Sequence, residues 1–416
     1  MTSQLVTSLD VDLHSHEMLV DPYPTYARMR EAGGVVWLEP HRMFAVPRYA
    51  EVAAVLTDWR SFICGEGVGM NDAVAQVPTS LQTDPPDHDR HRLIESKPLL
   101  PNAVRELEPE LRELATATVA ELCTRDRFDG VTDLAQVLPL GIVAKRVGFP
   151  PEGRERMMEW AAAGFDSFGM IDNPRTQQGL AKMQDAAQYL HSVCDKFEPG
   201  GWADRLMRVA DSGELDHQTC LGLISDYLYP SLDTTIHAIS AGLKLFADHP
   251  DQWDLLRSDR SLLPGAVSEV IRLGAPIQWF TRKVARTQAV GGAVLPEGSR
   301  VIVLYASANR DERQFPDPER FDITRPPYEQ VGFGRGKHAC MGMPLARLEM
   351  HVLFDVMADA VTRIETGRSE LALNNVLHGF SHLEVIFRAA TGLRDPISST
   401  TPTLNGTDWA ATEIEE

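Results

Sequence analysis

The sequence has no long run of apolar residues, and its first residues lack a basic stretch followed by an apolar one. A membrane-spanning helix needs about 20 consecutive apolar residues, and a secretory signal needs a basic segment before its apolar core. We therefore expect a soluble protein of the cytoplasm that uses no membrane.

Cysteine is scarce, and its five copies are spread over 416 residues, at Cys64, Cys123, Cys194, Cys220 and Cys340. Disulfide-stapled domains place even numbers of cysteines close together, and structural zinc sites place them in pairs. Here His338-x-Cys340 offers two ligands, and no second cluster of cysteine or histidine has the spacing of a metal site. The pattern fits a reducing compartment and argues against both disulfides and zinc.

Basic residues are also few, since 40 Lys and Arg face 59 Asp and Glu, which leaves a net charge of −19. Binding to nucleic acid requires a basic surface. The composition therefore argues against a nucleic-acid partner, and the acidity is explained by solubility.

What the sequence does contain is one cysteine among glycines, Cys340 in the segment FGRGKHACMG. Glycines permit tight turns, so several amide N–H groups can converge on the sulfur, and a helical pattern begins just after Gly342. Amides and a helix N-terminus lower the pKa of a thiol and favour the thiolate. Such a thiolate is a good axial ligand for haem iron, whereas the alternative is a buried structural cysteine.

The segment matches the motif Phe-Gly-x-Gly-x-His-x-Cys-x-Gly at every fixed position, and so the chain resembles the cytochrome P450 family of haem-thiolate monooxygenases. The resemblance implies haem b, with Cys340 as the iron ligand and O2 as co-substrate. It also implies cofactor contacts from Phe333, His338 and Gly342.

Helical patterns dominate residues 86–270, whereas short strands are predicted at 35–38, 43–46, 289–303 and near 371–388. The resemblance implies one domain, mainly α with a minor β portion, shaped as a triangular prism around a buried haem. We expect an N-terminal extension at 1–20, the haem-thiolate domain at 21–390 and a flexible tail at 391–416.

Two sets of charged residues can be assigned a role only through the resemblance to the family. His88 and Arg92, four residues apart on one helix face, would hold the haem propionates together with Arg282 and His338. A second set, Glu269, Arg272 and Arg320, would form a buried network that locks a helix to the loop before Cys340.

Asp233 and Thr234 lie in the middle of a long apolar helical segment at about 219–247. In the family this acid–alcohol pair lies over the iron and supplies protons for cleavage of the O–O bond. Relatives carry Ala-Gly or Gly-Gly where this chain has Pro230-Ser231, and proline forces a kink or bulge. Two outcomes are open: the oxygen-binding groove forms another way, or the coupling of electrons to product changes.

Among bacterial members, the layout is similar to those that oxidise para-substituted benzoates and related small aromatics. The segments that match their pocket supply the predicted substrate contacts, namely Glu66, Val68, Phe165, Phe168, Tyr229, Ile277 and Phe280. Aromatic walls suit a flat ring, although these side chains can also be ordinary core.

The anchor for the substrate differs from that of the benzoate-binding relatives. They place an arginine where this chain has Glu66, and their small polar helix residues correspond to Ser225, Asp226 and Tyr229. Because Glu66 and Asp226 would repel an anion, we expect a neutral or phenolic aromatic such as a methoxyphenol, and a cationic amine is also open.

The sequence therefore predicts a monooxygenase that hydroxylates or O-demethylates a small aromatic compound. No flavin or iron–sulfur motif follows residue 388, so electrons from NAD(P)H would arrive through a ferredoxin and its reductase, docked by Arg90, Arg335, Lys337 and Arg347. The alternatives are a hydroxylase of another hydrophobic metabolite or natural-product scaffold, a peroxide-driven oxygenase, and a haem-binding sensor or carrier without turnover.

Overall fold

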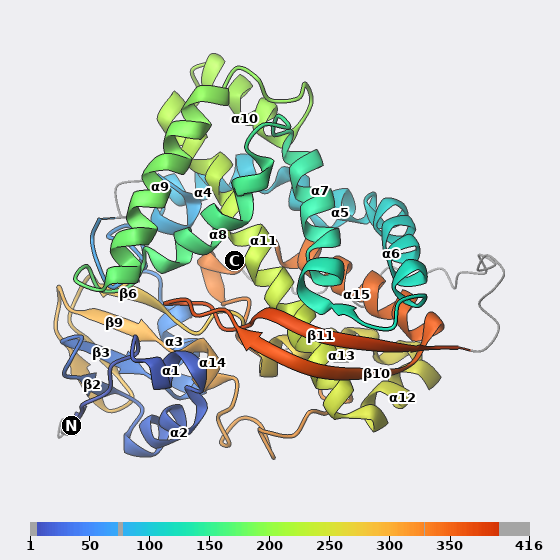
Figure 1. Cartoon of the computed structure of the whole chain (residues 1–416). Helices are drawn as coiled ribbons and strands as arrows, with labels where there is room; N and C mark the ends of the chain where they lie inside the picture. Colours follow the sequence, from blue (N-terminus) through green and yellow to red (C-terminus); the bar gives the residue numbers. More distant parts are fainter. Residues whose placement is uncertain (1–5, 74–77, 328, 391–416) are drawn as a thin grey trace.

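Helices make up most of the computed structural model, which describes residues 6–73, 78–327 and 329–390 (Figure 1). In chain order the helices are α1 His16–Val20, α2 Tyr23–Ala32, α3 Tyr49–Thr57, α4 Asp87–Glu95, α5 Pro101–Arg105, α6 Glu108–Leu122, α7 Val137–Val147, α8 Met157–Asp166, α9 Pro174–Val193, α10 Trp202–Asp211, α11 His217–Asp248, α12 Pro250–Ser258, α13 Leu263–Gly274, α14 Tyr305–Ala308 and α15 Met343–Ala360.

The strands form three sheets within the described residues. The largest has the order β1-β2-β3-β9-β6-β4, with β1 Thr7–Leu9, β2 Val36–Leu38, β3 Met43–Val46, β4 Phe62–Ile63, β6 Phe280–Val284 and β9 Arg300–Val303. The second has the order β10-β11-β5, with β5 Phe128–Asp129, β10 Val361–Leu371 and β11 Phe380–Ala389. The third pairs β7 Gln288–Val290 with β8 Ala293–Leu295.

Helix α11 runs through the middle of the molecule, where α8, α7, α10 and α13 pack against it (Figure 1). Asp216 caps its N-terminus by accepting a hydrogen bond from the Thr219 amide at 2.9 Å. The helix is assigned without a break through Pro230, so the kink or bulge expected there does not divide it. Side-chain hydroxyls bond to carbonyls around the proline, as Ser231 does to Tyr227 and Thr234 does to Pro230.

The chain forms one domain that is mainly α with a minor β portion, as expected, and its outline in Figure 1 is roughly triangular. Residues 7–9 of the predicted extension form an edge strand, with Thr7 paired to Val36, so they belong to the main domain. The predicted tail, 391–416, lies outside the described residues.

The strand β10 begins at Val361, directly after α15 ends, about ten residues earlier than the sequence predicted. The segment 361–370 has no turn residue at its start, and only pairing with β11, as in Ile364 with Phe387, makes it a strand. This pairing is between residues distant in the sequence, so local propensity does not reveal it.

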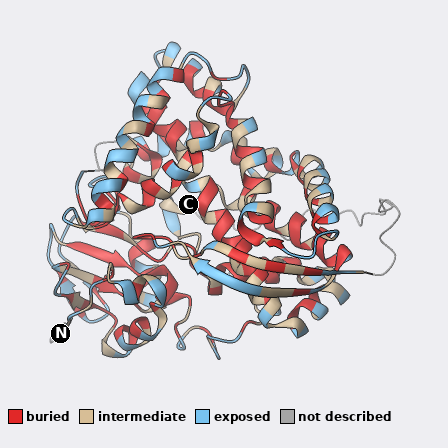
Figure 2. Cartoon of the chain, in the orientation of Figure 1, coloured by how far each residue is buried: buried red, intermediate tan, exposed pale blue. Residues whose placement is uncertain are grey.

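Buried residues concentrate on the inner faces of the helices and on the large sheet (Figure 2). The largest apolar cluster includes α11 and the helices around it, and two smaller clusters pack against the two faces of the large sheet. In the part of the chain that the structure describes, no helix is both long and apolar enough to cross a bilayer.

Candidate functional site

The Cys340 loop turns tightly in front of α15. Gly334 and Gly336 have φ of 70° and 69°, and a Cβ on Gly336 would lie 2.9 Å from the Leu56 carbonyl oxygen, so the loop needs glycine there. The Cys340 amide donates to the Phe333 carbonyl at 2.8 Å. The amides of Gly342 and Met343 point at the sulfur, as predicted. Cys340 is exposed as a residue, but its thiol lies toward the interior, and it forms no disulfide, so the sulfur is available to bind a ligand.

The predicted lowering of the Cys340 pKa is wrong for the protein alone. Burial raises the pKa of this thiol, and this effect outweighs the opposing pull of Arg92, the two amides and Arg347. The amides and guanidinium groups are thus placed to stabilise a thiolate once a metal replaces the proton.

The four predicted propionate ligands come together beside this loop. The rings of His88 and His338 lie 4.3 Å apart between centroids, and the Nε2 atom of each is buried without a partner among the described residues. Arg282 on β6 is buried, and burial together with Arg282 and His88 lowers the pKa of His338 to about 2. Arg92 donates to the Ala339 carbonyl at 2.5 Å.

These residues fit a haem. A free thiol sulfur faces amide donors, and two imidazole Nε2 atoms without hydrogen-bond partners among the described residues lie beside two guanidinium groups, which together match an iron ligand and the carboxylates of a porphyrin. His88, Arg92, Arg282 and His338 would hold the propionates, and Cys340 would bind the iron.

The structure also gathers Cys64, Asp84 and His338, whose ligand atoms lie within 4.8 Å of one another. The sequence alone did not indicate this cluster, because the three residues are far apart along the chain. Both Asp84 oxygens accept backbone N–H bonds, from Cys64 at 2.9 Å and Gly65 at 2.8 Å, and burial raises the pKa of Cys64 to about 11. Because Arg282 also faces the cluster, its charge disfavours a divalent cation there.

The predicted acid–alcohol pair, Asp233 and Thr234, lies in the middle of α11. Thr234 Oγ1 donates to the Pro230 carbonyl at 2.7 Å. Asp233 is buried, and its Oδ2 has no hydrogen-bond partner among the described residues. Burial, with a smaller contribution from Asp166, raises the pKa of Asp233 to about 7, so this carboxyl can hold and release a proton near neutral pH.

A cavity of about 330 Å³ lies between α8, α9, α11 and the segment 78–82. Phe165, Phe168 and Tyr229 line it, as predicted. Glu66, Val68, Ile277 and Phe280 are not among its described lining residues. Of these, Phe280 is in edge contact with Phe168, with ring centroids 5.9 Å apart, and it extends the aromatic wall behind the cavity.

The predicted substrate contact of Glu66 stays a prediction, and the side chain does not point into this cavity. It is 59% exposed and lies 3.5 Å from Lys283 Nζ, where the exposed carboxylate gains a cationic partner. Sequence matching gives the position of Glu66 in the loop but not the direction of its side chain.

The predicted buried network exists with a different second arginine. Arg272 makes two hydrogen bonds to Glu269, at 2.7 and 2.8 Å, and both side chains are 2% exposed. The second arginine is Arg325, whose Nε lies 3.2 Å from Glu269 Oε1. The prediction for Arg320 is wrong, because its side chain is 64% exposed and only its carbonyl accepts from Arg272.

Sequence reasoning also missed several polar residues that lie largely out of solvent, namely the buried Ser80, Glu95 and His237 and the half-buried Asp166. Asp166 has a pKa raised to about 7 by burial, and His237 Nδ1 is buried without a partner in the described part of the chain. A polar residue within an apolar pattern gives a weak signal, since the same residue on a solvent face looks identical in sequence.

Comparisons with known proteins agree with this geometry. The profile of the family described as Cytochrome P450 matches residues 203–357. Cytochrome p450 CYP199A2 of Rhodopseudomonas palustris is 35% identical over 389 residues, covering 91% of this chain and 94% of that protein. Cytochrome P450 monooxygenase PikC of Streptomyces venezuelae is 31% identical over 402 residues, with coverages of 91% and 94%.

Among solved structures, cytochrome P450 CYP109Q5 from Chondromyces apiculatus superposes with a TM-score of 0.79 at 28% identity, covering 93% of this chain and 100% of that one.

Proposed function

This chain belongs to the cytochrome P450 family, and we propose that it is the monooxygenase of a small aromatic compound that is neutral or phenolic. As a P450 monooxygenase it uses haem b and O2, with electrons from NAD(P)H delivered by redox proteins. The assignment of the substrate class rests on the cavity between α8, α9 and α11 and on the charges of its lining residues.

The observation that carries the proposal is the lining of this cavity. Phe165 and Phe168 supply aromatic walls, and the described lining residues include Asp226 but neither arginine nor lysine. A flat ring gains burial and edge-to-face contacts from such walls. A carboxylate on the ring would face Asp226 without a cationic partner, which costs binding free energy.

Each residue of the site has a separate role in the proposed reaction. When bound, the haem supplies the iron at which O2 is reduced and one oxygen atom is transferred to the substrate. Cys340 would bind the iron, and the amides of Gly342 and Met343 would stabilise the negative charge of its sulfur. Asp233 gives up its proton and recovers one from the interior, while the Thr234 hydroxyl, whose hydrogen is donated to the Pro230 carbonyl, is oriented to accept a hydrogen bond.

On a methoxyarene, hydroxylation of the methyl carbon gives a hemiacetal that collapses to a phenol and formaldehyde. One oxygen atom of O2 enters the substrate, and the other leaves as water with two electrons and two protons. A carrier without turnover would have no use for the buried acid next to Thr234, and a peroxide-driven oxygenase would not need it as a proton donor.

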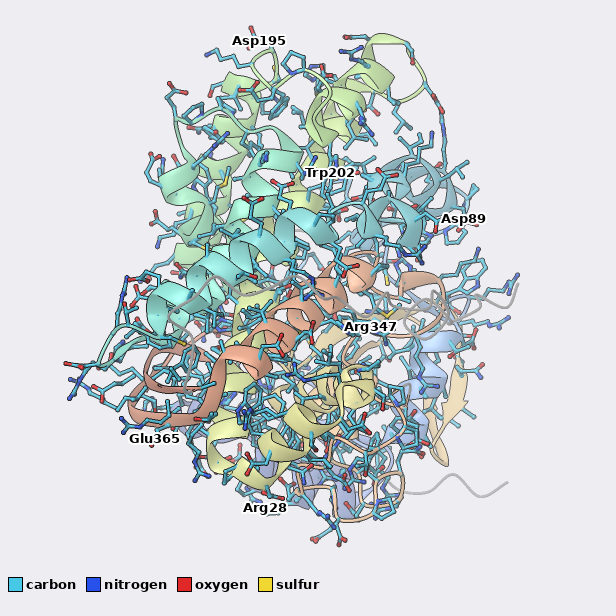
Figure 3. All side chains as sticks on the ribbon, turned by 90° about the vertical axis from the view of Figure 1, so that its right-hand side faces the viewer. Arg28, Asp89, Asp195, Trp202, Arg347 and Glu365 are labelled. Atoms are coloured by element: carbon cyan, nitrogen blue, oxygen red, sulfur yellow. The ribbon has the colours of Figure 1, made fainter. Side chains whose placement is uncertain are left out.

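The proposed electron donor is a ferredoxin, supplied by its own reductase, at the face around the Cys340 loop. Figure 3 views the side where α15 lies and labels Arg347 and Asp89 there. Lys337 pairs with Asp89 at 3.0 Å and Arg335 with the Tyr49 hydroxyl, so part of the predicted basic surface is already partnered. Arg347, 5.4 Å from the Phe333 ring, links this face to the cysteine loop.

Titration of the haem-loaded protein tests the proposed substrate. We expect 4-methoxyphenol to shift the iron toward high spin at a concentration about tenfold lower than 4-methoxybenzoate does, because only the anion meets the charge of Asp226. With ferredoxin and reductase, 4-methoxyphenol should then release formaldehyde. Tighter binding of the benzoate, or no spin shift with either compound, would overturn the proposal.

A further inference from the structure

Asp226 lines the cavity, and its carboxylate accepts hydrogen bonds from a neighbouring residue. Its Oδ2 accepts hydrogen bonds from the Ser80 amide at 2.7 Å and the Ser80 hydroxyl at 3.0 Å. The neighbouring Glu95 carboxyl shares a further hydrogen bond with Asp226. The side chain therefore has a fixed orientation, and its oxygens retain a lone pair for one more donor at the cavity wall.

The neighbour of Asp226 is Glu95 on α4, which is fully buried and shares a hydrogen bond with Asp226. Burial, with the charge of Asp226 adding to it, raises the pKa of Glu95 well above its usual range. Glu95 is thus the neutral member of the pair. Burial also raises the pKa of Asp226, to about 6, and the Ser80 donors and Arg92 oppose that rise, so Asp226 is the ionised member at neutral pH.

No cationic side chain of the described residues forms an ion pair with Asp226. The nearest positive group that acts on it, Arg92, donates to the Ala339 carbonyl instead. Buried charges in proteins are normally paired, because an unpaired charge in a low-dielectric interior is costly. A carboxylate held in place by Ser80 and Glu95, with acceptor capacity left at a cavity wall, therefore suits a ligand that brings the missing positive charge.

We propose that the Asp226 carboxylate anchors a protonated amine on the aromatic substrate, at the end of the cavity away from the iron site. The inference rests on the aromatic monooxygenase proposed above, and it extends the neutral and phenolic compounds named there to ring compounds whose distal group is a cationic hydrogen-bond donor. A phenolic hydroxyl would use the same carboxylate through a weaker, neutral donor.

The geometry of α11 allows the amine and the reacting carbon to be held at once. The residues of α11 that line the cavity follow helical spacing, at Gln218, Leu221, Gly222, Ser225, Asp226, Tyr229 and Pro230. This stripe leads to Thr234, one turn beyond Pro230. Asp226 precedes Thr234 by eight residues, or about 12 Å along the helix axis, a length comparable to one para-substituted ring with a hydrogen bond at its end.

The test compares three ligands that share a para-methoxy ring, namely 4-methoxybenzylamine, 4-methoxybenzyl alcohol and 4-methoxybenzoate. Binding to the haem-loaded protein is followed by the spin shift and by calorimetry at about pH 8, where Asp226 is ionised and the amine is protonated. The variants are Asp226→Asn, which removes the charge, and Tyr229→Phe, which removes a neutral polar group from the same wall.

In the wild type, the amine should have a Kd about tenfold or more below that of the alcohol, and the benzoate should bind most weakly. The Asp226→Asn variant should lose the preference for the amine, whereas Tyr229→Phe should keep it. The amine should produce the high-spin shift, because its nitrogen is held away from the iron.

Several results would contradict the proposed binding of a protonated amine by Asp226. These are equal affinity for amine and alcohol in the wild type, an unchanged preference in Asp226→Asn, or a low-spin spectrum that shows the amine nitrogen bound to iron. If Asp226→Asn does not fold, the ranking in the wild type still decides. If none of the three ligands changes the spectrum or releases heat, the proposed aromatic substrate itself fails, which is a separate outcome from equal binding of all three.

Discussion

The substitution Arg272→Leu is expected to lower the free energy of unfolding by about 3–5 kcal/mol. Arg272 is 1% exposed, and besides its two bonds to Glu269 it donates to the carbonyls of Asn309 at 2.8 Å and Pro318 at 2.7 Å. Leucine removes these donors and leaves Glu269 as a buried charge with Arg325 as its remaining cationic partner. The loop before Cys340 loses its attachment to α13 at the same time.

The matched control for this substitution is Arg320→Ala, because the sequence motif alone assigned Arg320 to the network. Its side chain is 64% exposed and 3.9 Å from Asp322, so its removal should change stability by no more than about 0.5 kcal/mol. Urea unfolding of the haem-loaded protein, followed by circular dichroism, measures both variants. Similar losses for Arg272→Leu and Arg320→Ala would contradict the network as the structure shows it.

The substitution Asp233→Asn is expected to reduce the rate of product formation about 100-fold or more, since a positioned proton donor contributes on the order of 10² to 10⁴. Asparagine keeps the shape of the side chain but has no proton to release. Because burial and Asp166 raise the pKa of Asp233 to about 7, the wild-type carboxyl holds its proton below about pH 7 and loses it above. Product formed per NAD(P)H should therefore fall as the pH rises through 7.

The same Asp-to-Asn change at Asp248 provides the control within the same helix. Asp248 is exposed at the end of α11, where it pairs with Lys244 at 2.6 Å, so its loss should leave turnover and its pH dependence intact. The pH dependence near 7 should disappear in Asp233→Asn. A variant that keeps the wild-type rate and the same inflection would show that another group delivers the proton.

The sequence allowed the cysteine loop and its surroundings to be predicted because their spacing is local. Three glycines, His338 and Cys340 lie within one decapeptide, and the structure turns that segment as the glycines require. The predicted fold class is confirmed for the same reason, since helical periodicity and motif spacing agree along most of the chain.

Predictions that depend on side-chain direction were less successful. Arg320 and Arg325 lie five residues apart in an irregular coil, where no periodicity tells which arginine turns inward. The direction of the Glu66 side chain, toward Lys283, is likewise not given by the sequence. The pair of Glu95 and Asp226 joins α4 to α11 across 131 residues, and nothing local in the sequence marks two acids as neighbours.

Local rules predict a kink or bulge at Pro230 but not whether the helix continues beyond it. Proline removes a helical hydrogen bond, but α11 is held by tertiary packing on α7, α8, α10 and α13, and it continues past the proline. Hydroxyl groups of Ser231 and Thr234 bond to carbonyls beside it. Packing thus preserves the helix that carries both Asp226 and Asp233.

The central claim is that the sulfur of Cys340 binds the iron of a haem held by His88, Arg92, Arg282 and His338. The most direct measurement is the absorption spectrum of the purified, reduced protein in the presence of carbon monoxide. Thiolate ligation predicts a Soret band displaced far to the red of its position in histidine-ligated haem proteins, and this band should be absent in Cys340→His. A wild-type spectrum without that displaced band would contradict the claim.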